Sequence, residues 1–136
     1  RLALVQGVED GLIDVIVSDH LPEDEESKRL PFAQAATGAV GVETLLPLSL
    51  EMYHNESLPL NKIIETLTIN PAKILQINKG SLSKGSDGDI CIFDLEAPWA
   101  VKAEELKSKS KNTAIEGRKL QGKVLMTFLN GELAFN

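Results

Sequence analysis

The chain of 136 residues has very little cysteine, histidine and aromatic residue. Its one cysteine, Cys91, excludes an internal disulfide and a zinc site built from cysteines. No apolar run approaches the roughly 18 residues of a membrane span, and the first residues do not form a signal-peptide pattern. A net charge of −6 argues against a nucleic-acid groove or a basic membrane face. We expect a protein of a reducing, cytoplasmic compartment, with no nucleic-acid or membrane partner.

The composition itself is that of a globular protein. Hydrophobic residues make up 43% of the chain and charged residues 25%, and the length suits one domain. The first residue is Arg1, and it stands inside a run whose apolar residues Leu2, Leu4, Val5 and Val8 recur at helical spacing. We therefore expect this chain to be a fragment of a longer protein.

A buried parallel strand is predicted near the start of the chain. Ile13 to Val17 is apolar apart from Asp14, and Val15 to Val17 is an unbroken β-branched run, which is typical of a strand covered on both faces. The polar residues Ser18, Asp19 and His20 follow it directly, at the carboxyl end where α/β folds place their chemistry. Helices are predicted over 42–53 and 60–67, and Asn70-Pro71 has the pattern of a cap followed by the first helical residue.

The last third of the chain has a different character. Short apolar strands are predicted at 90–93 and 124–129, and Asn130-Gly131 is a strong hairpin signal. Residues 1–79 contain no second convincing parallel strand, although a buried strand needs neighbours for its backbone groups. The pattern predicts the end of a larger α/β barrel or sheet over 1–79, followed by a β-rich part over 80–136.

Asp19 is the first candidate for chemistry. A carboxylate at the end of a buried strand can bind a metal ion and transfer a proton, or it can cap the following loop through backbone N–H groups. Strand alternation separates His20 from Asp19, which favours a structural role for His20. A catalytic zinc ion takes about three protein ligands. Asp19 and at most one histidine cannot supply them, so any further ligands lie outside this chain.

Five stretches, in order along the chain, resemble the dihydroorotase family. The segment 11–22 is similar to the last barrel strand with its Asp-His-Ala-Pro-His motif, and Gly41-Val42-Glu43-Thr44 resembles a Gly-Leu-Glu-Thr helix. Residues 67–75 resemble the family's Asn-Pro-Ala helix, and residues 84–90 resemble its Gly-x-x-Ala-Asp-Leu turn. Residues 108–113 match its Ser-Lys-Asn-Thr loop.

The resemblance implies a fold and a reaction. The fold is an amidohydrolase-type (β/α)8 barrel with a small β-sandwich, of which this chain would supply the last βα unit and the carboxyl-terminal strands. The reaction is the reversible hydrolysis of L-dihydroorotate to N-carbamoyl-L-aspartate in pyrimidine synthesis, with one or two zinc ions that polarise the carbonyl and activate water. Asp19 would ligate the metal and transfer the proton, and Thr37 and Gly38 would hold the substrate carboxylate.

One position departs from the family pattern. Glu23 stands where the family has a substrate-binding histidine, and a glutamate would repel an anionic substrate. Lys28 or Arg29 in the same loop could compensate, or substrate binding is altered. The alternatives are a non-catalytic homologue that supports aspartate transcarbamoylase, and another cyclic amidohydrolase of the hydantoinase or allantoinase type. We also expect a homo-oligomer, and no hydrolase activity from the 136 residues alone.

Overall fold

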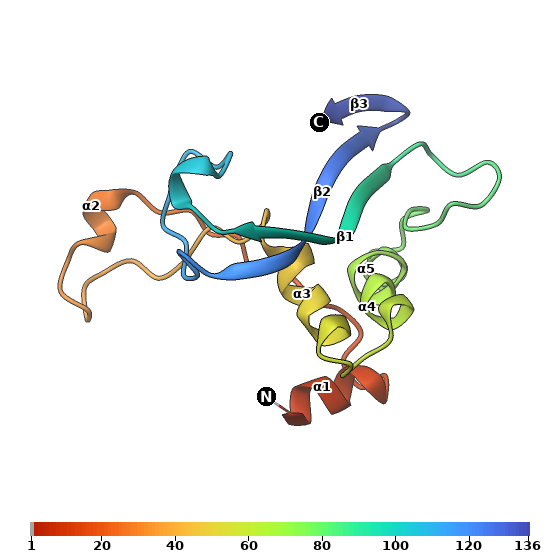
Figure 1. Ribbon diagram of the computed structural model, residues 1–136, viewed down its shortest axis with the longest axis horizontal. Coiled ribbons are helices and arrows are strands. Elements are labelled where there is room, and N and C mark those ends of the chain that lie inside the picture. Colours follow the sequence, from red (N-terminus) through yellow and green to blue (C-terminus); the bar gives the residue numbers. More distant parts are fainter. Residues whose placement is uncertain (1) are drawn as a thin grey trace.

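The computed structural model describes residues 2–136, in which the α-helices precede the strands (Figure 1). The longest helix, α3, has ten residues, and within the described residues no helix is long and apolar enough to cross a membrane. The elements are α1 (Leu2–Glu9), α2 (Glu25–Lys28), α3 (Leu45–His54), α4 (Leu60–Leu67), α5 (Ile69–Ile74), β1 (Ile90–Ala100), the 3₁₀ helix η1 (Ala103–Glu105), β2 (Lys119–Leu129) and β3 (Glu132–Phe135).

Helices α1, α3 and α4 form where the apolar spacing predicts them. Pro47 lies in the first turn of α3, where a missing N–H has no cost. The predicted cap at Asn70-Pro71 is wrong, because α5 begins at Ile69 with Thr68 as its N-cap. The Asn70 side chain instead donates a hydrogen bond to the carbonyl of Asp14, at 3.0 Å. That bond ties α5 to the segment that precedes Asp19.

The segment 13–17, predicted as a buried parallel strand, pairs with no strand among residues 2–136. Its Ile16 N–H donates to the carbonyl of Thr66, and one isolated parallel bridge joins His20 to Ala39. Val17 is 72% exposed. A strand is defined by a ladder of hydrogen bonds to a neighbouring strand, and among residues 2–136 the segment has isolated bonds to Thr66 and Asn70 and, just beyond its end, the bridge at His20.

The strands form one antiparallel sheet in the order β1-β2-β3, and the predicted hairpin joins β2 to β3. Asn130 and Gly131 have φ of 52° and 83°, as a two-residue turn of this kind requires. β1 is longer than the predicted 90–93. Its pairing with β2 shifts between Asp94 and Pro98, where the Asp94 carboxylate accepts hydrogen bonds from two backbone N–H groups. This side-chain turn coincides with the irregularity in the β1–β2 pairing.

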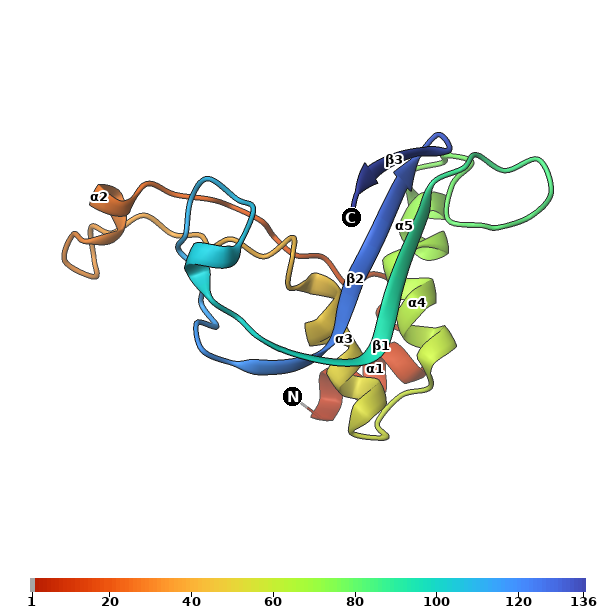
Figure 2. The ribbon, with the colours of Figure 1, turned by 45° about the horizontal axis from the view of Figure 1, so that its top comes forward.

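The core lies where α3 packs against β2 and where α4 closes on α1 (Figure 2). Leu50, Ile63 and Val101 are fully buried. Leu50 of α3 packs directly against Gly122 of β2. A Cβ atom added at position 122 would lie 2.5 Å from Cδ1 of Leu50. Trp99 of β1 donates its indole N–H to the Gly122 carbonyl at 3.1 Å. Helix α3 is therefore joined tightly to the sheet.

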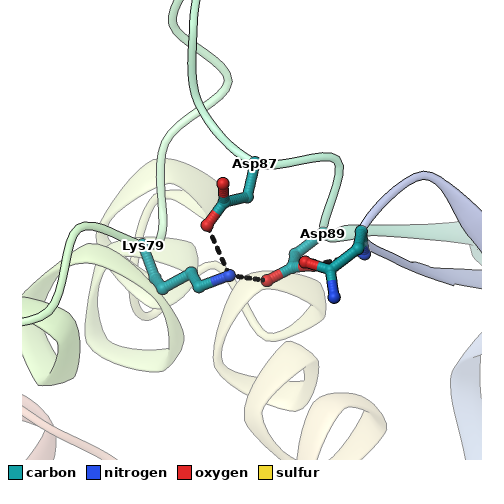
Figure 3. Close-up of polar contacts among 4 residues, drawn as sticks. Lys79, Asp87 and Asp89 are labelled. Atoms are coloured by element: carbon teal, nitrogen blue, oxygen red, sulfur yellow. Dashed lines mark hydrogen bonds and ion pairs between the residues drawn. The ribbon is translucent and has the colours of Figure 1, made fainter.

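A charged cluster joins the end of the helical region to the hairpin (Figure 3). The Lys79 ammonium lies 2.6 Å from a carboxylate oxygen of Asp87 and 2.5 Å from one of Asp89. The other Asp89 oxygen accepts the backbone N–H of Asn130 at 2.8 Å. Through Asp89, the segment after α5 is connected to the turn between β2 and β3.

Candidate functional site

An open cavity of about 880 Å³ lies beside the segment 13–19. α1, that segment, the loop 38–41 and α3 form most of its wall, and most of the lining side chains are apolar. Asp19 and Ser18 bring polar groups to it, and Gly38 and Ala39 border it with backbone. The carboxylate that the sequence singles out therefore faces an open space and lies next to the predicted carboxylate-binding loop.

Asp19 has an unusual backbone, with φ of 44°. Positive φ is uncommon outside glycine and is tolerated best by Asn and Asp, and strained residues of this kind cluster at functional sites. The turn ends the extended segment at this residue. No side-chain hydrogen bond among residues 2–136 uses the Asp19 carboxylate, so the loop-capping alternative is not realised in the described chain.

His20 is used by the fold. Its Nδ1 accepts the backbone N–H of Gly41 at 3.1 Å and that of Val42 at 3.4 Å. An accepting Nδ1 carries no proton, so this hydrogen-bond pattern assigns the tautomer with the proton on Nε2 to the ring that holds the start of the Gly41–Thr44 turn. The turned backbone at Asp19 lets these two adjacent side chains serve different purposes.

Two glycines allow the segments 18–21 and 38–41 to lie against each other. A Cβ atom on Gly38, whose φ is 124°, would stand 2.6 Å from the Leu21 carbonyl oxygen. A Cβ atom on Gly41 would stand 2.7 Å from that of Ser18. The absence of a Cβ atom at these glycines thus lets two backbone segments approach closely, and it brings Gly38 to the cavity that Asp19 also lines.

Thr37 and Glu23, the other predicted substrate-binding residues, do not line this cavity. Thr37 is exposed, and among residues 2–136 the N–H groups of Thr37 and Gly38 have no hydrogen-bond acceptor. Glu23 is anchored to the loop 110–112 through its backbone. Its N–H donates to the Asn112 side chain, and its carbonyl accepts a hydrogen bond from the Ser110 hydroxyl. The side chain at position 23 is free of this anchoring role.

Lys28 and Arg29, the two candidate compensating cations, differ. Lys28 donates to the carbonyls of Ala36 and Gly38, at 2.7 and 2.9 Å. Arg29 is paired with Glu25 one turn away on the exposed surface. Lys28 therefore places a positive charge against the predicted carboxylate-binding loop, and Arg29 is turned toward its own helix.

The long-range contacts of two residues, Asn112 and Glu43, were not predicted from sequence. Asn112 bonds to both Glu23 and Gly38, and the Glu43 carboxylate accepts the N–H groups of Lys107 and Ser108. Asn112 and Glu43 lie in motifs that carry the family resemblance, which is the signal that could have found them. Sequence spacing gave no chemistry for either, because their partners lie 64 to 89 residues away.

Residues 2–136 contain no cluster of three or more His, Cys, Asp and Glu side chains that could hold a metal ion. Asp19 alone fits a ligand role, as a carboxylate without a hydrogen-bond partner at an open cavity. His20 has its Nδ1 occupied by backbone N–H groups. The expectation of a metal set shared with residues beyond this chain is compatible with this geometry.

Comparison with known proteins gives consistent relatives. The chain is 44% identical over 135 residues to the dihydroorotase of Anaplasma phagocytophilum (strain HZ), covering 99% of the chain and 30% of that protein. It is 43% identical over 136 residues to the dihydroorotase of Wolbachia sp. subsp. Drosophila simulans (strain wRi), covering 100% of the chain and 31% of the relative. The chain thus spans about a third of the length of these curated relatives.

Among solved structures, the L-hydantoinase (dihydropyrimidinase) from Arthrobacter aurescens superposes with a TM-score of 0.87 at 33% identity, covering 96% of the chain and 30% of that protein. Its similarity extends through the helices and the sheet alike. The family profile described as the amidohydrolase family matches residues 1–134. The family profile matches almost every residue, and a solved hydantoinase shares the fold. The chain therefore belongs to the amidohydrolase family.

Proposed function

We propose that the complete protein containing this chain is a dihydroorotase, which hydrolyses L-dihydroorotate reversibly to N-carbamoyl-L-aspartate. The observation that carries the proposal is the Asp19 carboxylate, which has no side-chain hydrogen-bond partner among residues 2–136 and lies at a cavity wall that it shares with the backbone of Gly38. Relatives named dihydroorotase at 43–44% identity support the choice of substrate.

The proposed architecture is the last βα unit of a (β/α)8 barrel over 1–79 and the carboxyl-terminal strands of a β-sandwich over 80–136. The exposed apolar residues support it, since Leu4 and Val17 beside the cavity are 65% and 72% exposed. Large apolar side chains that line a cavity and are exposed to this extent are normally covered by other chain segments. The neighbouring barrel strands would cover them and would pair with the segment 13–17.

In this proposal Asp19 handles the proton. Hydrolysis adds water to the ring amide carbon and breaks the bond from that carbon to nitrogen. The Asp19 carboxylate accepts the proton that the attacking water loses and returns it to the leaving nitrogen, so the carboxylate is regenerated. Its turned backbone holds it at the cavity wall, and within the described part of the chain no hydrogen bond competes for its two oxygens.

A zinc site, with one or two ions, is proposed to include Asp19 as a ligand, with its other ligands outside this chain. Bound zinc supplies a Lewis acid that polarises the amide carbonyl and lowers the pKa of water. Within the chain, the N–H groups of Thr37 and Gly38 are proposed to bind the substrate carboxylate. Their lack of acceptors supports this role, because backbone N–H groups need a partner.

Two observations keep alternatives open. Glu23 supports a non-catalytic homologue that assembles with aspartate transcarbamoylase, since a carboxylate would repel the substrate. The likeness to an L-hydantoinase supports another cyclic amidohydrolase of the hydantoinase or allantoinase type.

The enzyme is proposed to be a cytoplasmic homo-oligomer that acts on a small molecule.

The test uses the complete, zinc-loaded protein. Dihydroorotate, hydantoin and allantoin are offered in parallel, and ring opening is followed. We expect turnover of dihydroorotate with kcat/KM at least about a hundredfold above the other two, and loss of turnover after chelation. Preference for hydantoin or allantoin would assign the alternative enzyme class. A protein inactive on all three that binds aspartate transcarbamoylase would favour the non-catalytic role.

A further inference from the structure

The loop 36–39 is held from behind by two side chains. The Gly38 carbonyl accepts hydrogen bonds from Lys28 Nζ at 2.9 Å and from Asn112 Nδ2 at 3.1 Å. Lys28 Nζ also donates to the Ala36 carbonyl at 2.7 Å. Lys28 belongs to α2, whereas Asn112 lies 74 residues beyond Gly38 in the loop that precedes β2. Two distant parts of the chain therefore meet at this loop.

These bonds fix the direction of particular N–H groups. The carbonyl of Ala36 and the N–H of Thr37 belong to one peptide plane and point in opposite directions, because every peptide bond among the described residues is trans. Lys28 thus turns the Thr37 N–H away from itself. The next peptide, which carries the Gly38 N–H, lies between two planes whose carbonyls are both held.

Asn112 makes further contacts that hold its own position. Its Oδ1 accepts the Glu23 N–H at 3.4 Å, and its backbone carbonyl accepts the Val40 N–H at 3.2 Å. Asn112 is half-buried, and its amide orientation follows from this pattern, with the oxygen facing an N–H and the nitrogen facing a carbonyl. Asn112 thus fixes the loop at Gly38 and at Val40, whereas Lys28 fixes it at Ala36 and Gly38. Gly38 has φ of 124°, a conformation that glycine adopts most readily, so these bonds on both sides restrict a residue with a permissive backbone.

We infer that Lys28 and Asn112 are positioning residues, which orient the N–H groups of Thr37 and Gly38 to receive the substrate's carboxylate. The inference rests on the proposed function and adds a contribution from the later part of the chain to the site. The ammonium of Lys28 also adds positive charge behind the loop and favours an anion in front of it.

The experiment measures kinetics and ligand binding in the complete, zinc-loaded protein. Asn112→Asp keeps the acceptor and removes the donor to Gly38, and Asn61→Asp, on the exposed face of α4, is the charge-matched control. Lys28→Met removes both bonds to the loop, and the exposed Lys109→Met is its control. Circular dichroism and the midpoint of urea unfolding verify folding. If Asn112→Asp does not fold, Lys28→Met carries the test by itself.

We expect KM for dihydroorotate to rise about tenfold in Asn112→Asp, which loses one hydrogen bond to the loop, and at least about tenfold in Lys28→Met, which loses two hydrogen bonds and a positive charge. In both variants kcat should change less than about threefold. The inhibition constant of 5,6-dihydrouracil, the same ring without the carboxylate, should stay unchanged. Equal weakening of both ligands, or an unchanged KM, would overturn the inference. A wild-type protein without dihydroorotate turnover would remove the proposed function as well, so the two failures are distinguishable.

Discussion

The ammonium of Lys79 lies 2.5 Å from Oδ2 of Asp89, whose Oδ1 accepts the backbone N–H of Asn130 in the hairpin turn. The Asn130 N–H, and then Lys79, hold the pKa of Asp89 below its ordinary value. Hydrogen bonds to Asp87 and then to Asp89 raise the pKa of Lys79 above its ordinary value. This connection between the helical region and the hairpin therefore depends on pH at both ends of the scale.

A lowered carboxyl pKa gives stability that is present above the unfolded pKa of about 3.9 and is lost as pH falls through the folded pKa. A raised lysine pKa gives stability that is present below about 10.4 and is lost as pH rises through the folded value. We expect the amide signal of Asn130 in two-dimensional NMR to be steady at neutral pH and to titrate with a midpoint below about 3.9.

The neighbouring Gly131 is the internal control for this titration, because its N–H donates to the Gly88 carbonyl, which does not ionise. Its signal should move far less than that of Asn130. In Asp89→Asn the acid transition of Asn130 should disappear. A titration that survives this substitution would assign the transition to another carboxyl group.

If Asp19 transfers the proton as proposed, Asp19→Asn should lower kcat for dihydroorotate in the complete protein at least about a hundredfold, because an amide cannot accept and return a proton. Its fold should remain, since no side-chain hydrogen bond among the described residues depends on this carboxylate. Asp14→Asn, in the same segment, is the matched control, because Asp14 is exposed and contributes its backbone carbonyl. Steady-state kinetics at saturating zinc compares the two, and near-normal turnover in Asp19→Asn would remove the role given to Asp19.

Gly38→Ala should destabilise the loop and weaken substrate binding. Its Cβ would stand 2.6 Å from the Leu21 carbonyl oxygen, and φ of 124° is unfavourable for alanine. Gly85→Ala, with φ of 91° and open space around its Cβ, carries the backbone strain without the clash. We expect a cost of about 1–3 kcal/mol at position 38 and a smaller one at position 85, as measured by urea unfolding. Equal costs would contradict the close approach.

Glu23→Gln should lower KM for dihydroorotate, by up to about tenfold, because it removes a negative charge near the proposed carboxylate site. The loop itself should not move, since Glu23 is anchored by its backbone N–H and carbonyl. Glu26→Gln, on the exposed side of α2, removes the same charge at the surface and should leave KM unchanged. An equal change in both variants would indicate a long-range charge effect instead of a local one.

Local features of this protein were predictable from sequence because they depend on near neighbours. The apolar spacing placed α1, α3 and α4, and Asn130-Gly131 placed the hairpin through its positive φ. Ser18-Asp19-His20 was identified as the candidate site from its position after a β-branched run, and Asp19 does line the open cavity. Family motifs in register also pointed to the amidohydrolase family that the comparisons show.

The tertiary structure decided how these pieces meet. Only folding brings Asn112 within hydrogen-bond distance of Gly38, 74 residues away, and sets the carbonyls of Ser18 and Leu21 against two glycines. The pairing of segment 13–17 could not be settled by pattern, because a strand also needs neighbours to complete its hydrogen bonds. Composition and spacing determine which groups are available and which local turns form, whereas long-range packing determines which of those groups face one another.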